Sequence, residues 1–139
     1  MSTRRESREC SLKMLYMVDN CKMSIENVHR FFDGYFLKGK VYRMFALSLF
    51  SGVCENKEKI DFFISQYAKN WELDRMAVVD RNIIRLAVYE IMTNKNTPIN
   101  IIINEAVEIS KKYSTKDSGK FINGILDKLK FIRLRKEGY

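Results

Sequence analysis

Apolar residues recur along most of the chain at intervals of three and four, the spacing that places them on one side of an α-helix. The clearest run lies between Val79 and Thr93, where Ile83, Ile84 and Ile91 are expected to face inward. Short polar or glycine-containing segments separate this run from its neighbours. The pattern predicts six or seven helices joined by short loops, at about residues 3–19, 24–32, 41–53, 57–67, 79–93, 98–112 and 117–133.

Several of these helix ends carry their own sequence signals. Ser24 begins the second helix, Asn56 marks a kink or a new start, and Thr97 is expected to cap the helix that opens with Pro98. A proline suits the first helical position because its missing N–H would have no partner there. Asp117 is the expected cap of the last helix, where a side-chain bond to the backbone stabilises by about 1 kcal/mol.

Asn123-Gly124 lies in the middle of the last predicted helix. This dipeptide is typical of hairpins, but the alternating flanks of a hairpin are absent, and Ile122, Ile125 and Leu129 keep the helical spacing. A glycine inside a helix costs about 1 kcal/mol relative to alanine. We therefore predict that the segment is helical and that another backbone or a ligand comes close to Gly124.

Charged residues inside the predicted helices need partners. Arg81 and Arg85 are expected to point outward one turn apart, where they repel each other unless an anion lies between them. Asp80, Glu90 or a partner molecule could supply that anion. Asn104-Glu105 interrupts the apolar side of its helix, which predicts a hydrogen bond to a neighbouring helix.

The composition narrows the fold class. A chain of 139 residues, 46% of them apolar, can bury one sizeable core, and one proline with six glycines is too few for many tight turns. We expect a single all-α domain over residues 1–139, a compact helical bundle. No apolar run approaches the length of a membrane span and the N-terminus lacks the hydrophobic centre of a secretory signal, so a cytoplasmic protein is expected.

Side chains that carry catalysis or bind metals are sparse. Cys10, Cys21 and Cys54 form no Cys-x-x-Cys pair, and His29 is the single histidine. Neither a zinc site, a disulfide framework nor a histidine-based triad follows, and the three thiols are expected to be buried or half-buried. Gly-rich phosphate loops and a nucleophile elbow are absent as well. We expect no enzyme, no metal and no cofactor.

Positive charge gathers at both ends of the chain. The formal charge is +8, and the segment from Lys111 to Tyr139 has nine basic and three acidic residues, a net of +6. Arg4, Arg5 and Arg8 lie on one side of the first helix. Three cations near a helix N-terminus oppose its dipole, which favours an anionic ligand, and arginine can donate two hydrogen bonds to one phosphate.

Aromatic residues stand beside these cations. Tyr16 lies further along the first helix, and Phe121 follows Lys120 at the start of the last helix. Such rings beside cations hold the bases of single-stranded RNA, and the free N–H groups of a helix N-terminus bind phosphate, although Asp117 should weaken phosphate binding nearby. Two alternatives to RNA binding remain open: the basic residues could form a solvated lysine-rich face, and Phe121 could belong to the core. The basic and aromatic residues that predict RNA binding are Arg4, Arg5, Arg8, Tyr16, Lys120 and Phe121.

Four segments follow one another in a specific order. They are Arg4 to Cys10 with Leu15-Tyr16, Asp80 to Glu90, Pro98 with Ile103-Asn104-Glu105-Ala106, and Asp117-Ser118-x-Lys-Phe-Ile-Asn-Gly-Ile-Leu-Asp-Lys. Together they span almost the whole chain, and in this order the sequence resembles the NusB family of transcription antitermination factors. A match of four ordered blocks is far more specific than any one motif.

The resemblance implies two small bundles packed as one unit, with three helices in an N-terminal part, residues 1–70, and four in a C-terminal part, residues 71–139. It also implies binding of boxA RNA in ribosomal RNA leader transcripts together with NusE, a small-subunit ribosomal protein. The complex helps RNA polymerase read through terminators. By motif position, Arg4, Arg5, Arg8, Asp117, Lys120 and Phe121 would contact RNA, while Tyr16, Asp80 and the adjacent Arg81 would bear on NusE contact. A homodimer over the RNA surface is an expected alternative state of the RNA-free protein.

Two other interpretations remain. NusB-like domains also occur fused to ribosomal RNA cytosine methyltransferases, but no cofactor-binding domain follows the predicted helices in this sequence, which argues against that activity. The other interpretation is a non-enzymatic helical adaptor whose basic surface binds a protein partner.

Overall fold

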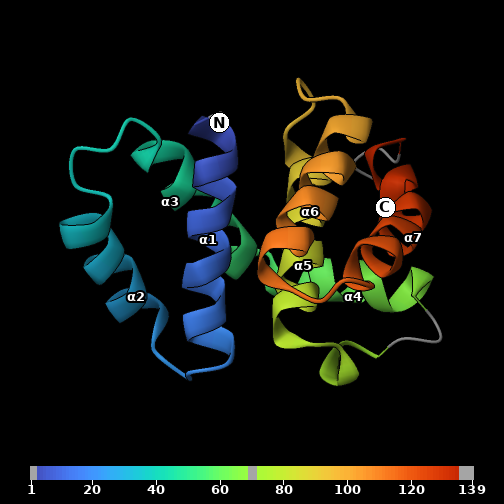
Figure 1. Ribbon diagram of the computed structural model, residues 1–139, viewed down its shortest axis with the longest axis horizontal. Helices are drawn as coiled ribbons and strands as arrows, with labels where there is room; N and C mark the ends of the chain where they lie inside the picture. The colour runs from blue at the N-terminus through green and yellow to red at the C-terminus, as the bar shows by residue number, and fades with distance from the viewer. Residues whose placement is uncertain (1–2, 69–71, 135–139) are drawn as a thin grey trace.

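Seven α-helices make up most of the computed structural model, which describes residues 3–68 and 72–134 (Figure 1). No strand occurs in these two ranges, so the predicted all-α fold is confirmed. A π-helical turn η1 (Phe32–Phe36) and two 3₁₀ turns, η2 (Leu73–Arg75) and η3 (Lys130–Leu134), complete the regular structure. The α-helices are α1 (Thr3–Asp19), α2 (Ile25–Phe31), α3 (Arg43–Glu55), α4 (Lys57–Tyr67), α5 (Val78–Thr93), α6 (Ile99–Tyr113) and α7 (Ser118–Leu129).

Helix α5 occupies the centre of the bundle. It packs against α1, α3, α4, α6 and α7, and Figure 1 shows α1, α2 and α3 gathered on one side and α4 to α7 on the other. Helices α1 and α3 link the two groups because both pack on α5. A division of the chain at residue 70 stays a prediction; by packing, α4 lies with α5 and α7 although it precedes that residue.

The central position of α5 means that polar side chains on it are buried together with apolar ones. Ile84, Val88 and Ile91 are fully buried, as the hydrophobic pattern predicted, but Arg85 and Glu90 are also less than a tenth exposed. A buried charge without partners costs several kcal/mol, so each one must find a hydrogen bond or an ion pair. Among the described residues, no buried side-chain nitrogen or oxygen lacks a hydrogen-bond partner.

The C-terminal end of α5 is closed by a side chain from the end of the described chain. The guanidinium of Arg133 donates to the carbonyl oxygens of Ile91 at 3.0 Å, Asn94 at 2.9 Å and Thr97 at 2.6 Å. These carbonyls include some that the helix itself cannot pair. Arg133 therefore fixes η3 against the α5–α6 loop.

The helix ends agree with most of the sequence signals. The Ser24 hydroxyl accepts from the backbone N–H of Asn27 at 3.1 Å, and α3 gives way to α4 at Asn56. Pro98 is the N-cap of α6, which begins one residue later than predicted. The third helix was expected from residue 41, but α3 begins only at Arg43, after a turn closed by the Arg43 N–H and the Lys40 carbonyl, and Val41 is 86% exposed before it.

The helical conformation predicted for Asn123-Gly124 is confirmed. The predicted approach of another backbone to Gly124 is wrong, and the approach of a ligand stays a prediction. Gly124 is exposed, and nothing lies within 4 Å of the position that a Cβ would take. The close approach occurs instead at Gly52, where an added Cβ would overlap the Tyr89 ring on α5. A Cβ on Gly119 would make only an ordinary contact, 3.4 Å from Val107 Cγ1 on α6.

The cysteines are unpaired thiols. Cys10 is buried and Cys54 is half-buried, as predicted, and burial raises the pKa of each to about 11. Cys21 is exposed, so the prediction was wrong there: it lies in the loop after α1, outside any helix interface. Over residues 3–68 and 72–134, no group of three metal-ligating side chains comes together. No helix in these ranges combines the length and hydrophobicity that crossing a membrane requires.

The two glycines Gly124 and Gly52 give opposite predictions for substitution by alanine. Gly124→Ala should raise the free energy of unfolding by about 0.5–1 kcal/mol, because alanine favours the helix and has room at this position. Gly52→Ala should lower it by about 1–3 kcal/mol, because the new methyl group collides with the Tyr89 ring. Urea denaturation followed by circular dichroism measures both. A loss of stability in Gly124→Ala would contradict the open environment of this residue.

Candidate nucleic-acid interface

The three arginines at the start of α1 differ in environment. Arg8 is 5% exposed and directs its guanidinium into the bundle, where Nε donates to Glu90 Oε2 at 2.7 Å and Nη2 donates to Glu90 Oε1 at 2.8 Å. Burial lowers the pKa of Arg8, but the hydrogen bonds and the charge of Glu90 outweigh it, so this pKa is raised overall. Arg8 is therefore a charged partner of the central helix in this conformation.

Arg5 joins α1 to α6. Its guanidinium donates to both carboxylate oxygens of Glu105, at 2.9 and 2.5 Å, and Glu105 Oε1 also lies 3.6 Å from Arg8 Nη1. The hydrogen bond from Arg5 holds the pKa of Glu105 below its ordinary value. This confirms the predicted hydrogen bond between neighbouring helices at Glu105. The protein's own carboxylates thus offset the repulsion expected from three cations near a helix N-terminus.

Arg4 is the exposed member of the three. Its guanidinium carbon lies 4.3 Å from the centre of the Phe45 ring on α3, within the distance of a cation–π contact. A guanidinium stacked on a ring keeps its N–H groups at the edge, where they can still donate to a phosphate. The structure thus places Arg4 at the surface, Arg5 part-way in and Arg8 inside.

The second predicted part of the interface lies at the start of α7. Asp117 and Lys120 are exposed, and Phe121 is half-buried against the core. Asp117 occupies the N-cap position, but its side chain makes no capping hydrogen bond, so that prediction was wrong. Its backbone is αR (φ −89°, ψ −9°), whereas a side-chain cap needs the extended conformation.

Asp80, expected to bear on a protein partner, is turned inward. It is 8% exposed and accepts hydrogen bonds from the hydroxyl groups of Ser114 at 2.6 Å and Ser118 at 3.0 Å. Ser114 follows α6 and Ser118 begins α7. Asp80 therefore holds the α6–α7 loop, which carries Asp117, against the N-terminal turn of α5.

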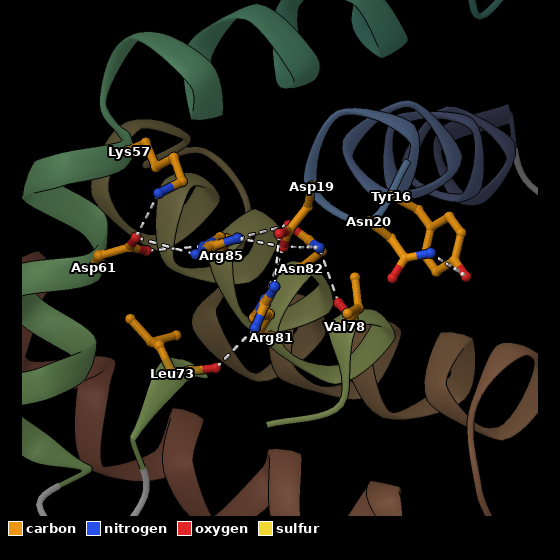
Figure 2. A network of polar contacts seen from close by, with 10 residues as sticks. All are labelled: Tyr16, Asp19, Asn20, Lys57, Asp61, Leu73, Val78, Arg81, Asn82 and Arg85. Carbon is orange, nitrogen blue, oxygen red and sulfur yellow. Dashed lines mark hydrogen bonds and ion pairs between the residues drawn. The ribbon is translucent and has the colours of Figure 1, made fainter. Parts of the chain in front are cut away.

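Arg81 and Arg85 belong to a polar network between α1, α4 and α5 (Figure 2). Arg81 donates to the two oxygens of Asp19 at 2.7 and 2.6 Å. Arg85 donates to Asp19 at 3.0 Å and to Asp61 at 2.8 Å, and Asn82 also donates to Asp19 at 2.9 Å. Hydrogen bonds from Arg81 in the first place hold the pKa of Asp19 far below its ordinary value of 3.8.

This network corrects the prediction that Arg81 and Arg85 point outward. Arg85 is only 6% exposed and Arg81 is half-buried. Asp19 is the anion between them, and Asp61 pairs with Arg85; both carboxylates come from other helices, and neither is Asp80 or Glu90. The helical pattern of α5 gave no sign of them because both carboxylates are distant in sequence.

Tyr16 lies on α1 beside this network (Figure 2). It is 37% exposed, and its hydroxyl accepts from Asn20 Nδ2 at 3.0 Å. Of the three residues predicted to bear on partner contact, Asp80 and Arg81 are engaged inside the protein. Tyr16 presents part of its ring to solvent.

A second seam of polar contacts joins α1 to the end of α6, and the sequence predictions did not include it. Glu9 Oε1 accepts from Lys112 Nζ at 2.9 Å and from the Tyr113 hydroxyl at 2.8 Å, and Lys13 Nζ lies 5.7 Å from the centre of the Tyr113 ring. Burial, followed by the bond to Glu9, raises the pKa of Tyr113. Two signals could have indicated the seam: a ring directly after two lysines, and the four-residue spacing from Arg5 to Glu9 to Lys13.

Comparison with known proteins identifies the family. A model of the NusB family matches residues 5–131. The chain belongs to the NusB family. The transcription antitermination protein NusB of Trichlorobacter lovleyi is 46% identical over 93% of this chain and 91% of its own length.

Solved NusB structures share the fold. T. maritima NusB is 37% identical and superposes with a TM-score of 0.84 over 99% of this chain and 96% of that one. A structure of the antitermination factors NusB and NusE in complex with dsRNA is 26% identical, with a TM-score of 0.81 over 94% of this chain and 97% of that chain. The resemblance read from the four motifs is therefore confirmed. Membership in this family of non-enzymatic transcription factors also confirms the expectation that the chain is not an enzyme.

Removing one partner of the buried Arg8–Glu90 ion pair should destabilise the fold more than removing the more exposed Arg5. Arg8→Met should lower the free energy of unfolding by about 3–5 kcal/mol, because it leaves the buried Glu90 carboxylate without its ion-pair partner. Glu90→Gln should lower it less, because Glu105 still lies 3.6 Å from Arg8. Replacing both by apolar residues should restore most of the loss. Arg5→Met is the matched control, since the Arg5 side chain is 33% exposed and its loss should cost about 1 kcal/mol. Equal losses in urea denaturation of the Arg8 and Arg5 variants would contradict this difference.

Because of the Asp19 network, the free energy of unfolding should fall with pH under acidic conditions. Because the pKa of Asp19 is lower in the folded than in the unfolded chain, its contribution is present above about pH 4 and is lost as the pH falls below that. The loss should be on the order of 2 kcal/mol. Asp19→Asn should be less stable near neutrality and flatter between pH 4 and 2, measured by urea denaturation across pH. Asp127→Asn, at an exposed pair with Lys130, is the control that should keep the wild-type slope.

Proposed function

We propose that this protein is a transcription antitermination factor that binds boxA RNA in ribosomal RNA leader transcripts together with NusE, so that RNA polymerase reads through terminators. The observation that carries the proposal is the likeness, over 94% of the chain, to a NusB solved with NusE and dsRNA. The name of the Trichlorobacter relative, a transcription antitermination protein, supports the same role. Such a factor acts where RNA is transcribed, in the cytoplasm.

The proposed RNA surface runs from the start of α1 to the start of α7. Arg4 is exposed at the first end, and Lys120 is exposed at the other, within the first turn of α7, where free backbone N–H groups can also bind phosphate. Arg5 and Phe121 lie between solvent and core, so in this proposal they contact RNA at their exposed edges. Arg8 supports the surface from beneath by holding α1 against α5.

NusE is the proposed protein partner. Tyr16 offers an exposed ring edge for it, next to the network that fixes the end of α1. Asp80 and Arg81 act in this proposal by holding the α6–α7 loop and α1 in place. A homodimer that covers the RNA surface is the proposed state when RNA and NusE are absent.

Electrophoretic mobility shifts with boxA-like and scrambled RNA, with and without NusE, test the function. We expect boxA RNA to bind more tightly than scrambled RNA at physiological salt, and NusE to increase the difference. Equal affinity for both RNAs would contradict specific recognition. Binding of NusE without any RNA binding would favour the protein adaptor instead.

A pair of lysines on α7 provides a charge-matched test of the surface. Lys120→Ala should weaken boxA binding several-fold and reduce the slope of log K against log salt by about 0.7, the loss of one phosphate contact to a single strand. Lys128→Ala removes the same charge two turns further along α7, where it is also exposed, and should leave both quantities unchanged. Equal effects from the two variants would show that only net charge matters.

A further inference from the structure

A groove lies between α1, η1 and the C-terminal end of α6. Its volume is about 280 Å³, and the residues around it include Glu9 and Lys13 from α1, Phe36 from η1, and Lys112 and Tyr113 from α6. Pockets for drug-sized molecules begin near 300 Å³. A space of this size accepts one small planar ring system.

Three aromatic residues line the groove, Phe36, Tyr42 and Tyr113, and the first and last of them lie near one cation. Lys13 Nζ lies 5.8 Å from the centre of the Phe36 ring and 5.7 Å from the centre of the Tyr113 ring. The Phe36 ring is 43% exposed, although burial would stabilise it. An exposed ring beside a lysine can stack on a nucleobase while the lysine pairs with a flanking phosphate.

A buried carboxylate supplies the polar contact. Glu9 is 7% exposed, and Lys112 and Tyr113 both donate to its Oε1. Within the described part of the chain, no hydrogen bond to the other oxygen of Glu9 is present, which leaves an acceptor that a ligand can use. Carboxylates accept hydrogen bonds from the exocyclic amino groups of bases.

The charge of the groove favours a neutral occupant over a phosphate. Its described lining has two carboxylates, Glu6 and Glu9, and two ammonium groups, Lys13 and Lys112, so the formal charges cancel. The groove also lies along the proposed RNA surface: α1 carries Arg4 and Arg5, and Asp117 follows Tyr113 by four residues.

We propose that this groove receives one unpaired nucleobase of the bound RNA, stacked on the exposed Phe36 ring, and that Glu9 selects a base with an exocyclic amino group over uracil. The inference rests on the proposed RNA-binding function and names one base pocket within it. Lys13 moves from the two rings to the adjacent phosphate when the base enters.

An abasic scan of boxA-like single-stranded RNA tests the pocket. Each nucleotide in turn is replaced by an abasic residue, and affinity is measured by fluorescence anisotropy. For the wild type, we expect one position where the abasic residue weakens binding about tenfold, the size of one lost stacking interaction. The Phe36→Ala variant should bind intact RNA about as weakly as the wild type binds RNA that is abasic at that position. An abasic residue there should not weaken the binding of Phe36→Ala any further.

Tyr35→Ala is the matched control. Tyr35 is the residue before Phe36 and is 78% exposed, but it does not line the groove, so its loss should leave the scan unchanged. Thermal melts followed by circular dichroism check that all variants are folded.

Base substitution at the sensitive position tests the role of Glu9. The wild type should prefer cytidine to uridine there about tenfold, the lower end expected for a good base contact. Glu9→Gln keeps an oxygen for Lys112 and Tyr113 but turns an amide donor toward the base, which should abolish or reverse the preference.

Three outcomes would overturn the inference. One is an abasic scan with no position that Phe36→Ala makes insensitive. Another is a Phe36→Ala variant that loses affinity for NusE but not for RNA, which would assign the groove to a protein side chain. The third is a wild type that binds no boxA RNA at all, which alone would also overturn the proposed function.

Discussion

The ion pair between Arg8 and Glu90 is the contact on which the arrangement of the bundle depends. Helix α5 is surrounded by other helices, so a glutamate on it cannot reach water and needs a partner from a neighbour. Arg8 supplies two parallel N–H groups from α1 and thereby fixes the position of α1 along α5. Apolar side chains alone would let α1 shift along α5 by one helical turn. The two parallel hydrogen bonds from the Arg8 guanidinium to the Glu90 carboxylate form in only one position of the two helices.

The same requirement recurs along the whole of α5. Asp80 is satisfied by the α6–α7 loop, Arg81 and Arg85 by the end of α1 and by α4, and Glu90 by the start of α1. The charges on the central helix therefore fix α1 at both of its ends, and also fix α4 and the α6–α7 loop. Together they place the start of α1 and the start of α7, the two ends of the proposed RNA surface, relative to one rigid helix.

Internal pairing also changes which cations are available to a ligand. The chain has a formal charge of +8, yet several of its arginines are engaged with carboxylates inside the bundle. The exposed positive charge is left to residues such as Arg4, Lys13 and Lys120. An interface built in this way separates two tasks, because the buried pairs hold the helices and the exposed cations and rings meet the nucleic acid.

The sequence by itself determined the helices, since the three-and-four spacing of apolar residues is a local property of the chain. It can be read without knowing which helices pack together. It also indicated the break at Asn56, the Ser24 cap, the helical Asn123-Gly124 and, through four ordered motifs, the family. The predicted roles of the individual site residues stay predictions.

Tertiary structure alone decided which charges are inside. Arg8 with Glu90, and Arg85 with Asp19 and Asp61, are pairs between residues far apart in sequence, and no helical pattern contains that information. The same holds for the glycines, because the space beside Gly52 is set by Tyr89 on another helix, while Gly124 faces solvent. Periodicity gives the side of a helix, but the partner of a buried charge and the room around a glycine depend on what packs there.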